Sequence, residues 1–246
     1  MDRLVYVAMS GAKETLRAQA ANNHNLANAN TNGFRADLSA FQTQNVTGAG
    51  LASRAYATSD VSGWDPSSGS LDATGRDLDV AVKGSGWIAV QANDGTEAYT
   101  RAGDLRVDPS GALMTATGNT VLGDSGPINV PPYSSIHIGG DGSVSIVPRG
   151  QTAQTISTVG RIKLVNPPAD QLVRGNDGLF RTSSGGESEA DATVHLMSGT
   201  LESSNVNIAE TMANMIELAR NYEVQVKAMK TAEDTAASST KLLQSS

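Results

Sequence analysis

The sequence has no cysteine, few aromatic residues and no long apolar run, and each shortage excludes a class of protein. Without cysteine, neither disulfide bonds nor thiolate metal sites can form. Phe, Trp and Tyr together make up only 4% of the 246 residues, whereas glycine occurs 25 times. No apolar stretch approaches the roughly 20 residues that a membrane-spanning helix needs. The composition predicts many short strands and tight turns, in a chain long enough for one large or two small domains.

The charge balance is acidic and contains no basic cluster. Lys and Arg number 18 and Asp and Glu 25, which gives a net charge of −7. Nucleic acids and anionic membranes attract clustered basic side chains, so we expect neither as a partner. The apolar run near the start, Leu4–Met9, is too short for a secretory signal and has no basic region before it. Taken alone, this pattern indicates the cytoplasm and leaves open export without a cleaved signal peptide.

Side chains that support catalysis or bind metals are scattered. Three histidines occur without metal-ligand spacing: His24, His137 and His195. Asp77 and Asp79 are predicted to share one face of a strand, where a carboxylate pair can serve as acid and base. Their position at the start of an apolar strand favours capping and solubility instead. We therefore predict no catalytic residue, no metal site, no cofactor and no small-molecule substrate.

Six asparagines fall within the eleven residues from Asn22 to Asn32, at the end of a helical pattern. Asparagine is unfavourable inside a helix because its amide competes for backbone hydrogen bonds. The side chains are therefore expected to bond to neighbouring chains or to the following turn. The pair Asn32-Gly33 predicts that the segment ends at a residue with positive φ. The plainer interpretation is an amphipathic helix that ends in a polar turn.

Both ends of the chain carry narrow stripes with alternating steps of four and three residues. The N-terminal stripe is Val5, Met9, Ala12, Leu16, Gln19, Asn23 and Leu26. The C-terminal stripe is Ile208, Met212, Met215, Ala219, Tyr222, Val226, Met229, Glu233, Ala236, Thr240 and Leu243. Such stripes predict long helices that require a partner helix, the C-terminal one roughly 50 Å long at ~1.5 Å per residue. Asn205 is the predicted N-cap of that helix. Two core helices of a globular domain are the alternative.

The middle of the chain predicts antiparallel β-structure. Strands are expected at Leu78–Val82, Trp87–Gln91, Glu97–Arg101, Leu105–Val107, Ala112–Thr115, Ser135–Ile138, Ser143–Val147, Gly160–Val165 and Gly178–Thr182. Turns that supply positive φ, or type I turns, are expected at Gly95, Gly111, Gly142 and Gly178. The predicted class is α+β: a mainly antiparallel β central domain with long terminal α-helices that pair in a coiled-coil-like stalk. The predicted regions are 1–35 with 200–246 as the helical part, 36–75 as an extended linker hairpin and 76–199 as the β-rich domain.

Three ordered blocks stand out beyond these patterns. The first contains Asn22, Asn23, Leu26, Ala27, Asn28, Thr31, Gly33, Phe34 and Arg35. The second runs from Asp77 to Trp87 and continues into Tyr99-Thr100-Arg101. The third contains Gly199, Leu201, Glu202, Ser204, Asn205, Val206 and Asn207, followed by Met215, Ile216, Arg220, Tyr222, Glu223 and Lys227. Together the blocks span nearly the whole chain and resemble the flagellar axial proteins, the rod and hook subunits of the bacterial flagellum.

The resemblance implies a structural subunit of the rod, and residues 1–12 are similar to the opening of the proximal-rod members. It implies other rod subunits and copies of the chain itself as partners. It further implies export in an unfolded state through the flagellar type III apparatus, and a place in the rod that crosses the periplasm. The terminal helices would line the inner tube and the β-domain would face outward. The assembly residues are Asn22, Asn23, Leu26, Ala27, Asn28, Thr31, Gly33, Phe34, Asn205, Val206, Met212, Met215, Ile216, Ala219, Arg220, Tyr222, Glu223, Val226 and Met229.

Three other functions remain open at this point. The chain could be a peptidoglycan-associated binding module or a wall-acting enzyme on a β scaffold, with Asp77 and Asp79 as its carboxylates. It could be the paralogous distal-rod protein. A soluble coiled-coil adaptor would explain the ends of the chain but not its β-rich middle. If the polymer hypothesis is right, both termini should be largely disordered in an isolated monomer, because narrow helical stripes without partners are unstable.

Overall fold

The computed structural model describes residues 2–45, 55–60, 63–151 and 155–244, which form two compact units. The first unit draws on residues 1–29, 36–65 and 206–246, and the second on residues 30–35 and 66–205. Each unit is described separately below. Parts of the predicted helical regions (residues 1 and 245–246) and of the predicted linker (46–54 and 61–62) lie outside the described residues.

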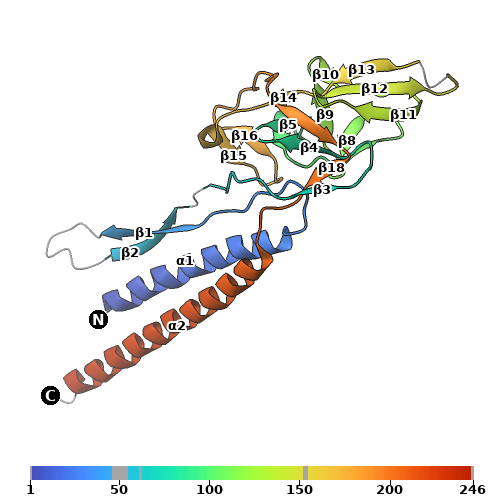
Figure 1. The fold of residues 1–246 in the computed structure, drawn as a ribbon. Helices are drawn as coiled ribbons and strands as arrows, with labels where there is room; N and C mark the ends of the chain where they lie inside the picture. The colour runs from blue at the N-terminus through green and yellow to red at the C-terminus, as the bar shows by residue number, and fades with distance from the viewer. Residues whose placement is uncertain (1, 46–54, 61–62, 152–154, 245–246) are drawn as a thin grey trace. The chain divides into compact units, whose positions relative to one another are not determined.

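The first unit contains two helices and one hairpin among the described residues. Helix α1 spans Asp2–Ala27, and the longer helix α2 spans Ile208–Gln244. The two helices lie alongside each other (Figure 1). Strands β1 (Ala40–Asn45) and β2 (Ala55–Asp60) pair antiparallel in register from Ala40 opposite Asp60. No helix in the described part of the chain is long and apolar enough to cross a membrane.

The buried face of α1 is not the predicted stripe. Small and polar side chains are buried there: Ala8, Ala12, Glu14, Thr15 and Ala18. Of the predicted stripe, Ala12 is buried, but Met9 and Leu16 are 51% and 48% exposed. A Cβ on Gly11 would lie 3.0 Å from the Gln225 side chain of α2, so the helices approach closely over small residues. The predicted register is wrong because close packing selects small side chains rather than the largest apolar ones.

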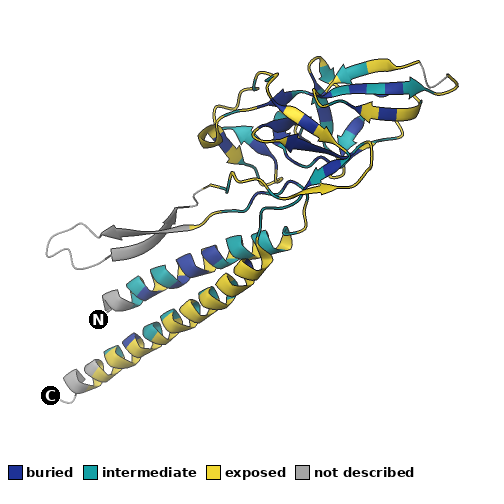
Figure 2. Ribbon diagram, in the orientation of Figure 1, coloured by how far each residue is buried: buried dark blue, intermediate teal, exposed yellow. Residues whose placement is uncertain are grey.

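Helix α2 is mostly exposed, with some partly buried segments (Figure 2). Four residues of its predicted stripe are partly buried: Met215, Tyr222, Met229 and Ala236. Six others are exposed: Ile208, Met212, Ala219, Val226, Glu233 and Thr240. The side chain of Leu243 lies outside the described residues. One helix partner therefore covers only part of the apolar surface that α2 presents.

The N-cap of helix α2 is Asn207, two residues after the predicted cap Asn205. The Asn207 Oδ1 atom accepts hydrogen bonds from the amides of Ala209 at 3.1 Å and Glu210 at 3.3 Å, which is the pattern of an N-cap. Asn205 is not the cap, and its side-chain amide donates to the Ser67 carbonyl at 3.0 Å. Two asparagines two residues apart offer the same chemistry, and only the backbone geometry decides which one caps the helix.

Among its described residues, the second unit contains short antiparallel strands and one 3-10 turn, η1 (Ala169–Gln171). Its first strands are β3 (Leu71–Ala73), β4 (Val80–Lys83), β5 (Trp87–Gln91), β6 (Glu97–Thr100), β7 (Leu105–Val107), β8 (Leu113–Thr115), β9 (Thr120–Gly123) and β10 (Gly126–Pro127). The remaining strands are β11 (Tyr133–Ile138), β12 (Ser143–Pro148), β13 (Ser157–Arg161), β14 (Leu164–Val165), β15 (Leu172–Arg174), β16 (Phe180–Thr182), β17 (His195–Ser198) and β18 (Thr200–Glu202). With the two helices, this arrangement confirms the α+β class.

Among the described residues, the largest sheet has the order β15-β16-β6-β5-β9-β8-β7, with β10 beside β9 and β14 beside β5. Strands β11, β12 and β13 form a second sheet, while β17 pairs with β4 and β18 with β3. The core packs between these strands, and Ile88, Val90 and Leu105 are fully buried in it. The glycines of the four predicted turns have positive φ, with values of 83° at Gly95 and 94° at Gly111.

Strand prediction was accurate for some strands of this unit and incomplete for others. Strand β5 has its predicted bounds, whereas the predicted strand Gly160–Val165 is interrupted and divides into β13 and β14. The strands missed as elements are β3, β9, β10, β15, β17 and β18, although His195 is in a run that was predicted to be strand-like. The last two are only four and three residues long and join through Gly199, which has a φ of 68°.

Candidate functional site

The deepest charged site in the second unit is a cluster of two arginines and one glutamate. Glu202 on β18 is 1% exposed, and its Oε1 accepts a hydrogen bond from Arg35 Nη2 at 2.7 Å. Its Oε2 accepts from Arg101 Nη1 at 3.0 Å, and the Gly69 amide donates to Oε1 at 3.1 Å. The three side chains, called the charge cluster below, join segments separated by 101 and 167 residues in the sequence.

The charge cluster holds more positive than negative charge in a buried place. Burial lowers the pKa of the Arg101 guanidinium, Arg35 acts in the same direction, and Glu202 opposes both. Arg101 also donates to the Gly84 carbonyl at 2.7 Å and lies 5.3 Å from the centre of the Trp87 ring. Removal of one partner from a buried ion pair typically costs about 3–5 kcal/mol, so Glu202 is expected to be essential to this part of the fold.

Gly33 at the end of the asparagine-rich segment fits against the charge cluster. Its φ is 68°, and a Cβ there would lie 2.3 Å from the carbonyl carbon of Arg101. The Gly33 amide donates to the Glu202 carbonyl at 2.8 Å. Both the positive φ and the lack of space require glycine at this position. The prediction that the segment ends at a glycine with positive φ is confirmed.

Phe34 is held by an arginine stacked between two rings. The Arg174 guanidinium lies 4.6 Å from the centre of the Phe34 ring and 4.9 Å from that of Phe180, and it donates to the Arg35 carbonyl at 2.6 Å. The Asn205 amide donates to the Phe34 carbonyl at 3.4 Å. The chain that follows α1 and the chain that precedes α2 are therefore bonded to each other.

The asparagine side chains of the first unit make intramolecular bonds. Asn22 donates to the Thr211 carbonyl on α2 at 2.8 Å. Asn25 donates to the Asp37 carbonyl at 2.9 Å and accepts from the Asp37 amide at 2.7 Å, and His24 Nδ1 lies 2.5 Å from Asp37 Oδ2. The asparagine-rich segment thus binds the turn that follows it and the second helix. Asn23 and Asn30 remain exposed.

Large apolar side chains lie on the outside of the helices. On α1 the outer stripe is Tyr6, Met9 and Leu16, and on α2 it is Ile208, Met212 and Ile216. Ile216 is 73% exposed, more than any other large apolar residue of the described helices. The remaining predicted assembly residues are partly buried (Leu26, Asn28, Val206) or exposed (Ala27, Thr31, Arg220, Glu223).

The predicted carboxylate pair does not form. Strand β4 begins at Val80, Asp77 is exposed in the preceding turn, and Asp79 is buried. Arg76 forms an ion pair with Asp79, and the Thr74 hydroxyl donates to Asp79 Oδ2 at 2.6 Å. The shared strand face was predicted because β4 was expected to begin at Leu78. Within the described residues, no group of three or more His, Asp or Glu side chains is arranged to hold a metal ion.

The charge cluster was missed as a unit from the sequence. Arg35, Arg101 and Glu202 each belong to a different block of the family resemblance, but nothing in the sequence pairs them. The available signal was the presence of at least one charged residue in each block.

Comparison with known proteins identifies the family to which this chain belongs. Residues 81–146 match the family described as flagellar hook protein FlgE/F/G D1 domain, and residues 197–242 match flagellar basal body rod FlgEFG protein C-terminal. The chain belongs to the flagellar basal-body rod protein family, as its relatives along nearly the full length show.

Among these relatives, the flagellar basal-body rod protein FlgF of Escherichia coli K12 is 44% identical over 99% of both chains. FlgF of Salmonella typhimurium LT2 is 43% identical over the same shares. The flagellar basal-body rod protein FlgG of Bacillus subtilis 168 is 33% identical over 95% of this chain and 96% of its own.

Proposed function

We propose that this chain is a structural subunit of the flagellar rod, in its proximal part, and polymerises there with other rod proteins and with copies of itself. The observation that carries the proposal is the outward position of large apolar residues on α1 and α2, while small residues are buried on the inner face of α1. A globular protein arranges these residues in the opposite way. The helices are therefore built to be covered by neighbouring chains.

Burial of the outer stripes would supply the energy for assembly. Full burial of one Ile, Leu or Met side chain contributes about 1.5–3 kcal/mol. Met212 and Ile216 are 54% and 73% exposed, so each still has most of that free energy to gain in contact with a neighbour. Contacts between unlike surfaces that do not close on themselves build helical tubes. In our proposal the helices pair in a coiled-coil-like stalk that lines the inner tube, and region 76–199 faces outward.

The charge cluster would serve as the joint at which both connecting segments are fixed. Gly33 and Phe34 bond to Glu202 and Asn205 through backbone hydrogen bonds, and Arg35 secures the same segment through Glu202. The two connecting segments are bonded side by side at this cluster. The signature residues Gly33 and Phe34 are thus proposed to act in the subunit's own joint.

Family membership supports the rest of the proposal. We infer export through the flagellar type III apparatus and a final position in the part of the rod that crosses the periplasm. The 44% identity to a FlgF protein, against 33% to a FlgG protein, favours the proximal-rod assignment over the distal-rod one. Asp79 is bonded to Arg76 and Thr74, which disfavours a wall-cleaving carboxylate pair.

Replacement of Ile216 tests the proposal. Ile216→Asn removes the most exposed large apolar side chain of α2 and should abolish swimming when it replaces the natural chain in a motile cell. Ala213→Asn is the matched control, because Ala213 is an exposed residue of the same helix outside the outer stripe. Both purified variants should unfold at the same temperature as the natural chain. Normal swimming and rod incorporation of Ile216→Asn would contradict the proposal.

A further inference from the structure

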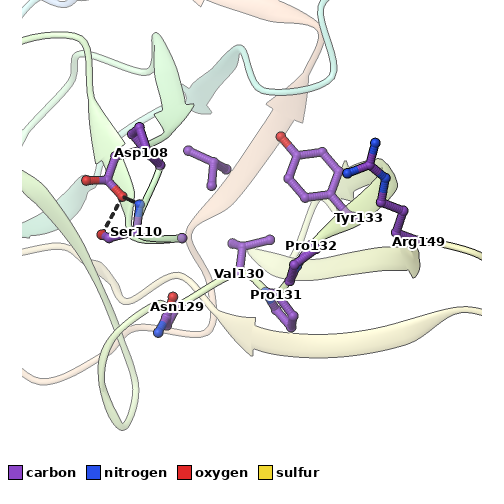
Figure 3. Close-up of a pocket in the computed structure, with 11 residues that line it drawn as sticks. Asp108, Ser110, Asn129, Val130, Pro131, Pro132, Tyr133 and Arg149 are labelled. Atoms are coloured by element: carbon purple, nitrogen blue, oxygen red, sulfur yellow. Dashed lines mark hydrogen bonds between the residues drawn. The ribbon is translucent and has the colours of Figure 1, made fainter.

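A surface pocket of about 560 Å³ lies in the second unit (Figure 3), and no residue of the charge cluster lines it. Its walls are the turn from Asp108 to Gly111, the segment from Asn129 to Tyr133, and Arg149. The volume lies within the range of roughly 300–1,000 Å³ that is typical of small-molecule sites. None of the residues of the outer stripes or of the asparagine-rich segment lines it.

The pocket is held open by its own backbone. The Val130 amide donates to the Gly111 carbonyl at 2.7 Å, and the Arg149 amide donates to the Pro132 carbonyl at 3.2 Å. Gly111 has a φ of 94°, and a Cβ there would lie 2.6 Å from Asn129 Oδ1, so the turn packs directly on the neighbouring segment. Three prolines stiffen the walls: Pro109, Pro131 and Pro132. A ligand would not have to order these walls on binding.

Several polar side-chain atoms of the pocket make no hydrogen bond to the described part of the chain. Asp108 Oδ1 accepts hydrogen bonds from the Ser110 amide and hydroxyl and from the Ala112 amide, whereas Oδ2 has no such bond within the described residues. The side chains of Asn129, Tyr133 and Arg149 make no hydrogen bond or ion pair with any part of the chain that the structure describes. The pocket therefore offers both donors and acceptors.

We propose that this pocket binds an oligosaccharide that carries N-acetyl groups. The Asn129 amide offers both a donor and an acceptor, which suits hydroxyl and acetamido groups, and the Tyr133 ring and prolines provide an apolar surface for the C–H face of a sugar. Asp108 and Arg149 carry opposite charges, and the whole chain carries −7, so a neutral ligand is favoured over an acidic peptide or a phosphate. The inference goes beyond rod assembly and does not depend on it.

Titration of the isotope-labelled full chain with an N-acetylglucosamine trimer tests the site by nuclear magnetic resonance. Saturable shifts are expected at the amides of Gly111, Val130 and Arg149. Arg149→Ala and Tyr133→Ala should each weaken binding by about tenfold, the loss expected for one charged hydrogen bond or one aromatic contact. Arg106→Ala is the matched control, because Arg106 is exposed on β7 and does not line the pocket.

Two further observations keep the test decisive. Tyr133 packs partly against the core, so if Tyr133→Ala does not fold, Arg149→Ala and Tyr133→Phe decide instead, with circular dichroism as the folding check. No saturable shift up to about 10 mM trimer, or equal binding by all variants, would overturn the proposal. Stronger binding of inorganic phosphate or a glutamate-rich peptide to the same residues would overturn the assignment to saccharides.

Discussion

Glu202→Gln is the most informative single change in the second unit, because it removes the negative charge shared by two buried arginines. The glutamine is nearly the same size, so no cavity forms. Its Oε1 can still accept from Arg35 and the Gly69 amide, but an NH₂ group now faces Arg101 Nη1, where the carboxylate accepted a bond at 3.0 Å. Two guanidinium groups then remain buried without a counter-charge.

The expected loss follows from the burial of the pair. Arg35 and Glu202 side chains are 1% and 0% exposed, so solvent screening is small. Breaking such a pair costs about 3–5 kcal/mol. Against a total stability of about 5–15 kcal/mol for a natural domain, the change would remove roughly a fifth of it or more. Arg101 loses one of two bonds and keeps the one to the Gly84 carbonyl.

Urea unfolding of the full chain, followed by tryptophan fluorescence, measures this loss. Trp87 lies 5.3 Å from the Arg101 guanidinium and reports on the charge cluster directly. Glu187→Gln is the matched control, an exposed carboxylate expected to change stability by less than about 0.5 kcal/mol. The double variant with Arg35→Met should lose less than the sum of the two single changes, because one excess charge is removed. A Glu202→Gln loss below about 1 kcal/mol, or strict additivity, would refute the reasoning.

Other predictions concern the turns and the helices. Gly33→Ala should lower the free energy of unfolding by at least about 1–3 kcal/mol, as measured by thermal unfolding. This loss should exceed that of Gly118→Ala, because Gly118 also has a positive φ but has open space around it. Equal losses would show that Arg101 does not crowd Gly33. Hydrogen bonds from Ser110 keep the pKa of Asp108 below its usual value. The ionised Asp108 carboxylate therefore stabilises the folded state above about pH 4, and this stabilisation is lost as the pH falls further. Asp108→Asn should reduce that acid dependence, and an unchanged unfolding profile at low pH would argue against it. In a dilute monomer, amide exchange should be fast across 206–243, and strong protection there would contradict the need for neighbours.

The parts of the fold that the sequence predicted well are those set by local chemistry. Strand β5 follows from an unbroken apolar run, and the turns at Gly95 and Gly111, both with positive φ, follow from an Asp-Gly pair and from an Asp-Pro-Ser-Gly sequence. Both helices were expected from their spacing, although α2 is capped by Asn207 rather than Asn205. These features depend on residues within a few positions of one another.

The features that were missed depend on partners far along the chain. The outer position of Met9 and Leu16 results from close packing of small residues, which a search for apolar periodicity ranks low. The charge cluster joins Arg35 to Glu202 across 167 residues, a pairing that no local pattern encodes. Strand β18 is three residues long and exists through its pairing with β3, which is also outside the reach of a local pattern.

A side-chain-resolved electron-microscopy map of the intact basal body would test rod assembly by the outer stripes most directly. We expect the chain in the proximal rod, with Met212 and Ile216 buried against helices of neighbouring subunits. A map in which the chain is present but these side chains face open solvent, or in which the β-rich unit alone makes the contacts, would contradict the proposed assembly.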